Sequence, residues 1–481
     1  MFTYKEALDY IYRFVNYEHK VHYIYGEETW NLKRVADLLS RLNDPHRRFR
    51  SVHIAGTRGK GSTAAMIESC LRAAGYRTGL YTSPHLHSFR ERIQVNGQPI
   101  SPEALADVVS RCRAALDATP GVTTFESITA IAFAYFAQQN VEWAVVEVGL
   151  GGRLDATNVI LPEACAIASI SYDHTDVLGN TLSQIAREKA GIIKPGIPVV
   201  SAPQEDEARE VIEEVCRARR APLTLVGRDW VWEQGAADLR GQSFRARKRT
   251  PFPAARPFSD DGREAFTPEA GGDYWIPLLG RHQLANATGV LAVLDILRQH
   301  GVRLPDEAVR RGLASVRWPG RMEVLRPTDG DPPVVVDGAQ NADSALKLQE
   351  ALAEWFPGRG LVLVFGASSD KDIPGMLHHL LPIARVAIVT RSRHPRAADP
   401  ATLASLAETH PARPSDLRVT HSVAEALTEA LDAARPDEIV CATGSLFVVA
   451  EAREAWLARY PQSLPADDWA RMAETVTAAM R

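Results

Sequence analysis

A glycine-rich turn that carries a single lysine follows an apolar run near the start of the chain. In the segment SVHIAGTRGKGSTAA (residues 51–65), the apolar run ends at the turn and an amphipathic pattern follows. Backbone N–H groups in such a turn can converge on an anion, and the N-terminus of the following helix adds partial positive charge. Lys60 would then reach the β- and γ-phosphates of a nucleotide, and the hydroxyl of Ser62 or Thr63 would approach phosphate-bound magnesium.

The spacing of this turn leaves a second interpretation open. GTRGKGS does not match the pattern GxxxxGK[ST] by strict count. The alternative is a tight turn between a strand and a helix, with a lysine on the surface.

A carboxylate interrupts a second apolar run. Glu147 lies at the start of VEVGLGGRLDATNV (residues 146–159), inside a predicted strand. Because an unpaired buried carboxylate is costly, Glu147 should be paired or bound to a metal. Magnesium, a hard cation that takes oxygen ligands, fits this position. The alternative is a salt bridge to Arg153 or another basic residue. The glycines after Glu147 predict a second loop at the carboxyl end of a strand, where α/β proteins tend to bind ligands.

Polar side chains also follow the apolar run ACAIASIS (residues 164–171). Asp173, His174 and Asp176 come directly after it, so the carboxyl end of this predicted strand is a candidate site. A lone histidine in such a place is more often structural. Lys189 lies in the next helical pattern beside Glu188, where an ordinary helix would leave it in solvent.

Two later segments add candidates. In RHQLANA, His282 and Asn286 are four residues apart and share one face of a predicted helix, either to cap it or to contact a ligand. WPGRMEV places Arg321 near a predicted domain junction, and VVVDGAQNADSA places Asp337 at the end of a strand. An arginine at a junction could clamp phosphate and couple domain closure to nucleotide binding.

The elements that must position these residues alternate between short β-branched runs and helical patterns. Such alternation predicts mainly parallel sheets covered by helices. The pattern starts again at about residue 333, so we expect two domains, 1–317 and 318–481, with the boundary near Trp318 and Pro319. Residues 228–275 are rich in Gly, Pro, Arg and Asp and include the basic run from Arg245 to Arg249. We expect a flexible, solvated insertion there.

Composition excludes several classes of protein. The chain has 481 residues, 45% apolar and 24% charged, with a net charge of -4, which disfavours nucleic-acid binding. Its five cysteines form no CxxC pair, so we expect neither structural zinc nor an oxidising compartment. The first residues, MFTYKEALDYIYRF, contain neither a secretory signal pattern nor a membrane span. We therefore expect a cytoplasmic protein that binds no membrane.

Taken in order, these motifs resemble the Mur ligase superfamily, and within it the folylpolyglutamate synthase and dihydrofolate synthase branch. The resemblance covers nearly the whole chain, and TSPHL, RERI and GLGGRLDATN indicate the folate branch. It implies an α/β protein with an N-terminal P-loop-type ATPase domain and a C-terminal Rossmann-like glutamate ligase domain. It also implies ATP-driven joining of L-glutamate to folate or dihydropteroate through an acyl phosphate, with ATP and Mg²⁺ as cofactors, in a monomer.

The resemblance also implies roles for individual residues. Lys60, Glu147, His174 and Lys189 would be catalytic, and the magnesium ligands would be Ser83, Glu147, His174 and a carbamylated Lys189. ATP would contact Gly56, Thr57, Arg58, Gly59, Lys60, Gly61, Ser62, Asn286, Arg321 and Asp337. The other substrates would contact Thr29, Trp30, Asn31, Ser83, Pro84, His85, Thr123, Thr124, Phe125, Glu126, Leu154, Asp155, Ala156 and Gln340, the last standing where the family usually has histidine.

Two other functions are compatible with parts of this pattern. A related ligase could join an amino acid to a different carboxylate, such as a peptidoglycan precursor or another pterin. A non-catalytic nucleotide-binding protein would keep the Lys60 loop but would not need Glu147, His174 and Lys189 together.

Overall fold

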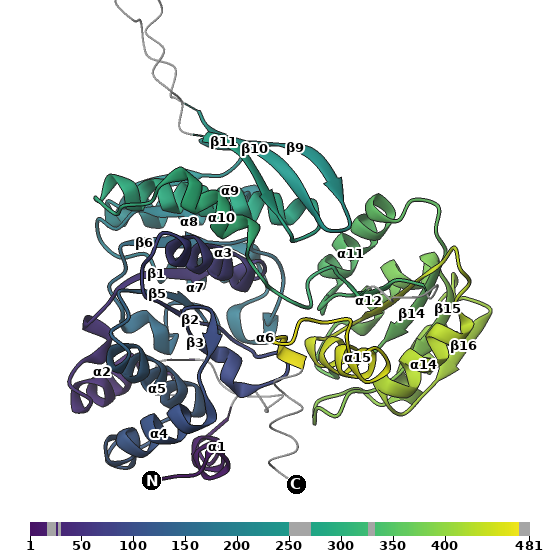
Figure 1. Cartoon of the computed structure of the whole chain (residues 1–481), viewed down its shortest axis with the longest axis horizontal. Coiled ribbons are helices and arrows are strands. Elements are labelled where there is room, and N and C mark those ends of the chain that lie inside the picture. The colour runs from purple at the N-terminus through teal and green to yellow at the C-terminus, as the bar shows by residue number, and fades with distance from the viewer. Residues whose placement is uncertain (17–25, 27–29, 250–270, 326–331, 471–481) are drawn as a thin grey trace, which may run out of the picture.

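The chain folds into two lobes, each built on a mainly parallel sheet (Figure 1). The computed structural model describes residues 1–16, 26, 30–249, 271–325 and 332–470. The sheet of the first lobe has the order β4-β3-β2-β5-β1-β6-β7-β8, and its only antiparallel pairs are β2 with β3 and β3 with β4. Its strands are β1 (Arg50–Ala55), β2 (Thr78–Tyr81), β3 (Ile93–Val95), β4 (Gln98–Pro99), β5 (Trp143–Glu147), β6 (Ala164–Ile167), β7 (Val199–Ser201) and β8 (Leu223–Leu225).

Helices cover both faces of this sheet, so its central strands β1 and β5 are buried almost throughout. One face packs against α3 (Lys60–Ala73), α9 (Arg281–Gln299) and α10 (Asp306–Ala314). The other face is covered by α1 (Tyr4–Tyr12), α2 (Leu32–Arg41), α4 (Pro102–Asp117), α5 (Thr124–Gln138), α7 (Leu182–Ala190) and α8 (Asp206–Arg219). The short α6 (Thr175–Leu178) precedes α7.

The second lobe repeats this architecture on a smaller scale. Its sheet has the order β12-β13-β17-β14-β15-β16, antiparallel only between β12 and β13. The strands are β12 (Glu323–Leu325), β13 (Val334–Val336), β14 (Leu361–Phe365), β15 (Ala384–Val389), β16 (Asp416–Val419) and β17 (Ile439–Thr443). The helices are α11 (Ala342–Trp355), α12 (Ile373–Leu380), α13 (Pro400–Glu408), α14 (Val423–Ala433) and α15 (Leu446–Arg459). The predicted α/β class with two parallel-rich sheets is confirmed.

The segment between α10 and β12 connects the lobes and contains Trp318. We propose that the division of the chain at residues 317 and 318 lies in this connection. Among the described helices, none combines the length and the apolar character needed to cross a lipid bilayer.

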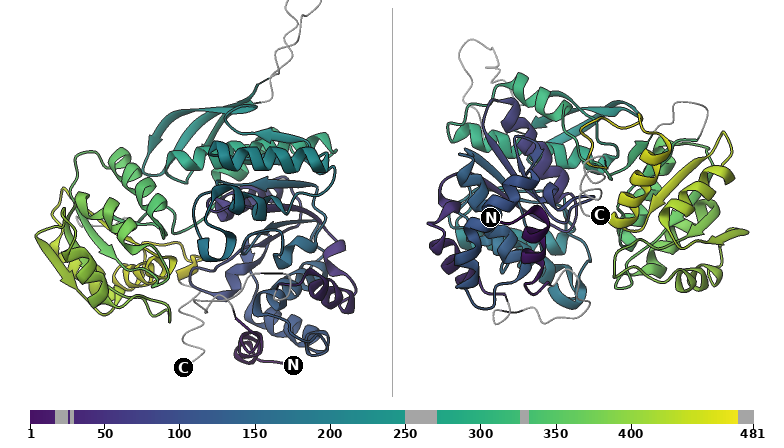
Figure 2. Two further views of the ribbon diagram at one scale, coloured as in Figure 1. Left: turned by 180° about the vertical axis from the view of Figure 1, so that it is seen from behind. Right: turned by 60° about the horizontal axis from the view of Figure 1, so that its bottom comes forward.

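The prediction of a flexible loop over residues 228–275 was wrong for the residues that the structure describes there. They form an antiparallel sheet of β9 (Trp230–Asp238), β10 (Gly241–Lys248) and β11 (Gly271–Ile276), which lies along one edge of the first lobe (Figure 2). The side chains of Phe244 and Ala246 are buried in the core shared with α9, while Arg245 points outward and pairs with Asp273. Basic side chains that point outward thus alternate with apolar side chains that point inward. This alternation at every second residue is typical of a strand and was the signal in the sequence.

Replacing Phe244 tests whether this sheet is part of the folded core. Phe244→Ala removes a fully buried ring, so we expect the free energy of unfolding to fall by about 3–5 kcal/mol in urea unfolding followed by circular dichroism. The control is Arg245→Ala on the same strand, which breaks only an exposed ion pair and should cost less than about 1 kcal/mol. Equal, small effects of both variants would contradict the packing described.

Candidate active site between the lobes

A cavity of about 1600 Å³ lies between the two lobes, and both contribute to its walls. The first lobe supplies the carboxyl ends of its central strands, and the second supplies the start of α11 and the loops after β13, β14 and β17. Most of the residues that the sequence singled out line this cavity: Trp30, Thr57, Arg58, Gly59, Lys60, Gly61, Ser62, Ser83, Pro84, His85, Phe125, Glu147, His174, Asn286, Arg321, Asp337 and Gln340.

The glycine-rich turn joins β1 to α3 at the floor of the cavity. Gly59 precedes the helix with φ of 78°, a left-handed conformation that favours glycine. A Cβ atom at position 59 would lie 2.7 Å from Asn286 Oδ1, and one at position 61 would lie 2.5 Å from Trp318 Cζ2. The turn is therefore pressed between α9 and the connection to the second lobe, which explains two of its glycines. From the sequence, Trp318 is predicted only to mark the domain boundary.

Lys60 and Glu147 face each other across this floor. Lys60 Nζ lies 3.8 Å from Glu147 Oε1, and Glu147 also accepts a hydrogen bond of 3.3 Å from the Ser83 backbone N–H. Burial raises the pKa of Glu147 to about 7, and the Lys60 ammonium opposes that rise. The alternative of a salt bridge to a basic residue is borne out with Lys60 as the partner, whereas Arg153 was wrong because it pairs with Glu188.

Lys189 lies buried on α7 behind the turn, so the interpretation as a solvated helix lysine was wrong. Its Nζ donates a hydrogen bond of 3.0 Å to the carbonyl oxygen of Gly56, and neither residue is part of the cavity wall. Burial, together with the Lys60 ammonium, lowers the pKa of Lys189 to about 7. A neutral amine is thus accessible near neutral pH.

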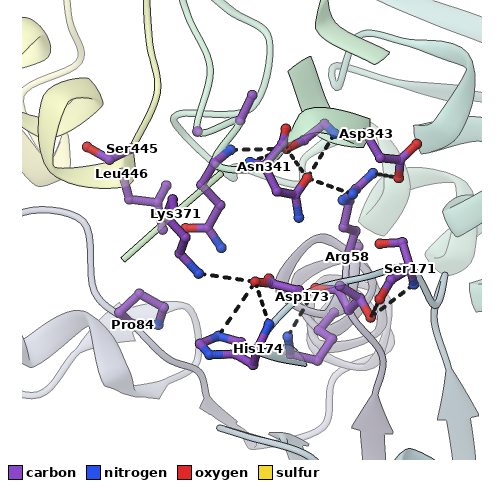
Figure 3. Close-up of a pocket in the computed structure, with 18 of the residues that line it drawn as sticks. Arg58, Pro84, Ser171, Asp173, His174, Asn341, Asp343, Lys371, Ser445 and Leu446 are labelled. Carbon is purple, nitrogen blue, oxygen red and sulfur yellow. Dashed lines mark hydrogen bonds and ion pairs between the residues drawn. The ribbon is translucent and has the colours of Figure 1, made fainter. Parts of the chain in front are cut away.

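An ion pair crosses between the lobes beside His174 (Figure 3). Lys371 Nζ, from the loop after β14, lies 3.1 Å from Asp173 Oδ1, which is 3.9 Å from His174 Nε2. Burial favours a higher pKa for Asp173, but the facing His174 and Lys371 outweigh it and lower the pKa to about 2. Burial lowers the pKa of His174 to about 4, so the imidazole is neutral at pH 7. Sequence analysis gave Lys371 no role, although its place after a strand was a usable signal.

Arg58 makes a second contact between the lobes (Figure 3). Its guanidinium donates to Asn341 Oδ1 at 2.7 Å and pairs with the carboxylate of Asp343, both at the start of α11. The phosphate-loop candidate is thereby tied directly to the second lobe.

Arg321 and Asp337 lie on the second lobe's side of the cavity. Asp337 accepts hydrogen bonds from the backbone N–H groups of Met322 (2.8 Å) and Ala339 (2.9 Å). Burial raises the pKa of Asp337, and Arg321 works against that rise. The Asp337 carboxylate therefore shapes the chain around Arg321.

The RHQLANA segment faces the cavity from the start of α9. Asn286 donates to Gln283 at 3.1 Å, and Gln283 donates to Ser62 Oγ at 3.3 Å. The capping role considered for His282 and Asn286 was wrong, because Gly280 is the residue before the helix and no side chain caps it.

Several predicted substrate contacts have structural roles and are not part of the cavity wall. Thr123 caps α5, Asn31 caps α2, and Glu126 forms an ion pair of 2.7 Å with Arg34. Thr124, Leu154, Asp155 and Ala156 are buried outside the cavity lining. Thr29 lies outside the described residues.

Asp155 organises the loop that follows Glu147. Its carboxylate accepts hydrogen bonds from the backbone N–H groups of Gly149 (3.0 Å), Leu150 (2.9 Å) and Thr157 (3.0 Å). Gly149 and Leu150 line the cavity, so Asp155 holds a piece of its wall from behind.

The donor set suits a magnesium ion bound together with a nucleotide. Within the described part of the chain, no three His, Cys, Asp or Glu side chains are grouped as a protein metal site requires. Ser83 and Glu147 nevertheless lie side by side at the cavity, close to Lys60. Mg²⁺ usually takes one or two protein oxygens and completes its shell with water and phosphate, so these residues fit it.

Comparison with known proteins agrees with this geometry. Residues 54–294 match the model of the Mur ligase middle domain, and residues 320–446 match that of the Mur ligase glutamate ligase domain. The chain is 35% identical to the Bacillus subtilis dihydrofolate synthase/folylpolyglutamate synthase over 92% of this chain and 99% of that protein. It is 39% identical to a Halobacterium salinarum protein described as a probable bifunctional folylpolyglutamate synthase/dihydropteroate synthase, over 89% of this chain but only 50% of that protein.

Solved structures show the same similarity. Mycobacterium tuberculosis folylpolyglutamate synthase complexed with ADP and AMPPCP has a TM-score of 0.78 and 35% identity, covering 89% of this chain and 96% of that one. E. coli FolC in complex with DHPP and ADP has a TM-score of 0.77 and 29% identity, covering 95% and 98%. The chain belongs to the Mur ligase family. Within it, the chain falls among the folylpolyglutamate and dihydrofolate synthases.

Replacing Asp155 tests its structural role. Asp155→Ala leaves three backbone donors in the loop without their acceptor, so we expect the free energy of unfolding to fall by at least about 2 kcal/mol in urea unfolding. Asp37→Ala, which removes an exposed carboxylate from α2, is the control and should change it by less than about 1 kcal/mol. A stable Asp155→Ala protein with weakened substrate binding would instead favour direct substrate contact.

Proposed function

We propose that the chain is an ATP-dependent ligase that joins L-glutamate to a folate-type carboxylate through an acyl phosphate. The observation that carries this proposal is the convergence of the glycine-rich turn, Glu147 and Arg321 at one cavity between the lobes. Family membership supports the reaction class. The presence of Glu147, His174 and Lys189 around a single turn argues against a non-catalytic nucleotide-binding protein.

ATP would bind with its triphosphate on the turn before α3. Lys60 and the N-terminus of α3 would neutralise the β- and γ-phosphates, because both present positive charge to the cavity. Arg321 would approach the same phosphates from the second lobe, and Asp337 would keep it in place. Asn286 and the residues Gly56, Thr57, Arg58, Gly59, Gly61 and Ser62 complete the proposed ATP site.

Ser83, Glu147 and His174 would hold magnesium, with Lys189 as a further ligand once carbamylated. Bound there, Mg²⁺ would neutralise phosphate charge and orient the γ-phosphoryl group. Burial of Lys189 supports carbamylation, because the neutral amine that its lowered pKa provides is the form that reacts with carbon dioxide. A carbamate would replace a cation by an anionic oxygen ligand.

The reaction would proceed in two steps. An oxygen of the folate-type carboxylate attacks the γ-phosphorus, the bond to the bridging oxygen breaks, and ADP leaves with that bond's electrons. The amino nitrogen of glutamate, in its neutral form, then attacks the acyl carbon, loses a proton, and phosphate leaves from the tetrahedral intermediate. The chain contributes position and charge neutralisation through Lys60 and Arg321, and it needs no nucleophile of its own.

The folate-type acid and the amino group of glutamate would bind along the cavity walls that the proposed ATP site does not occupy. Trp30, Ser83, Pro84, His85 and Phe125 form the first lobe's side, where we place the folate-type acid. Gln340 and Lys371 line the second lobe's side, where we place glutamate. The Lys371 ammonium pairs with Asp173 and would have to exchange that partner to bind an incoming carboxylate.

One copy of the chain would suffice, since both walls of the cavity come from the same molecule, and we therefore expect a monomer. The five cysteines are free and buried, which supports a reducing, cytoplasmic location.

A substrate panel tests the function directly. Dihydropteroate and reduced folates that carry one glutamate, such as tetrahydrofolate, are each incubated with ATP, magnesium and L-glutamate. The products are resolved by mass. We expect a product one glutamyl residue heavier for at least one folate-type acid, with ADP and phosphate released in equal amounts. Lys60→Ala should be folded and inactive, because the γ-phosphate loses its cation. If the protein turned over a different carboxylic acid and none of the folate-type acids, it would instead be another Mur-type ligase.

Labelled bicarbonate tests the modification of Lys189. With ¹³C-bicarbonate, the wild-type protein should give a carbamate carbon signal in ¹³C NMR, and Lys189→Ala should not. Lys194→Ala is the control, because this lysine is hydrogen-bonded to Asn158 and should leave the signal unchanged. Lys189→Ala should also lose activity, regained only in part, if at all, with a small added carboxylate. Full activity without one would contradict a carbamylated ligand.

A further inference from the structure

The side chain of a histidine from the first lobe is buried against a helix of the second lobe. His87 follows the cavity-lining residues Pro84 and His85, and its side chain is fully buried. Its Nε2 lies 2.6 Å from Arg453 Nη1, and its Nδ1 lies 3.2 Å from Glu454 Oε1. Both partners are on α15, which lies on the side of the second lobe that faces the first (Figure 1).

The two contacts define the tautomer of a neutral His87 ring. A guanidinium only donates hydrogen bonds, so Nε2 must accept from Arg453. The proton of the neutral ring is then on Nδ1, from which it is donated to Glu454. Both ring nitrogens of His87 thus form hydrogen bonds, one to each of two adjacent residues of α15. Such a contact fixes the orientation of the ring as well as its distance from the helix.

Arg453 is itself held rigidly. Its side chain has no exposed area, and it forms ion pairs with Glu323 (2.9 Å) on β12 and Asp468 (2.7 Å) near the end of the described chain. A buried guanidinium paired in this way cannot reorient without leaving charges unpaired. His87 therefore docks against a fixed partner.

The loop that carries His87 is also rigid. The buried carboxylate of Glu91 accepts hydrogen bonds from the backbone N–H groups of Leu86 (2.7 Å), His87 (2.8 Å) and Ser88 (2.6 Å). A constraint on His87 is consequently passed to Pro84 and His85 in the cavity wall.

The helix on the other side reaches the same cavity. Ser445 and Leu446, at the start of α15, line it opposite Pro84 (Figure 3). Arg453 lies seven residues after Leu446, two turns along the same helix. The contact between His87 and α15 therefore links the two walls of the cavity outside it.

We propose that His87 is a positioning residue for the ligation, which fixes the distance between the wall proposed for the folate-type acid and the wall proposed for glutamate. The inference rests on the proposed function. His87 touches neither substrate: it acts through the loop 83–88 and through α15. The part of the proposed ATP site that lies on the first lobe, around α3 and α9, makes no contact with His87.

Steady-state kinetics of His87 variants test this role. His87→Ala should raise the KM for both glutamate and the folate-type acid about tenfold or more and lower kcat, since small displacements of reacting groups are costly. The KM for ATP should rise less than these two, because most of the proposed ATP contacts are on the first lobe and only Arg321 and Asp337 are on the second. His87→Gln keeps an acceptor and a donor and should restore most of the loss.

Hydrogen exchange gives a second readout that needs no turnover. In His87→Ala, the amides of residues 83–88 and 445–449 should exchange faster, while those of α3 should not. His421→Ala, which replaces an exposed histidine of the second lobe, is the matched control and should change neither kinetics nor exchange.

Unchanged KM values for all substrates, or a uniform fall in kcat that His87→Gln does not relieve, would overturn the proposal. Unchanged exchange in both segments would also overturn it. If the wild-type protein ligates no folate-type acid, the proposed function fails, and the exchange experiment alone then decides whether His87 links the two walls.

Discussion

The burial of charge at the floor of the cavity is the constraint on which the rest of the structure depends. Lys60 and Glu147 face each other on that floor, Lys189 lies buried behind it, and Arg321 and Asp337 approach from the second lobe. Burial shifts the pKa values of Glu147 and Lys189 toward their neutral forms, which is the response of groups that lack enough counter-charge. A polyphosphate with its magnesium would supply both the missing anion and the missing cation, and so this floor suits a nucleotide better than it suits water.

The two lobes enclose that floor through polar contacts at separate places. Arg58 and Lys371 line the cavity and pair with groups of the opposite lobe, and His87 contacts α15 of the second lobe outside the cavity. Apolar packing accompanies these polar contacts, because Leu86 of the first lobe lies in a hydrophobic core of the second. Together they hold the two walls of the cavity next to each other.

Local patterns carried most of what the sequence could predict. The turn with Lys60, the buried Glu147 and the two parallel sheets all follow from runs of neighbouring residues. Thr123 and Asp155 are predicted to contact substrate, and the structure shows them capping α5 and holding the loop after Glu147, because a capping residue and a ligand residue have the same side-chain chemistry. The pairing of His87 with Arg453 could not be predicted, since it joins residues 366 positions apart through the docking of two lobes.

A crystal structure of the protein with Mg²⁺ and AMPPCP tests the central claim most directly. The account predicts the terminal phosphate on the turn before α3, within hydrogen-bond distance of Lys60, with Arg321 approaching from the second lobe and Glu147 directed at the metal. A nucleotide bound elsewhere, or a triphosphate that leaves Lys60 paired only with Glu147, would contradict it.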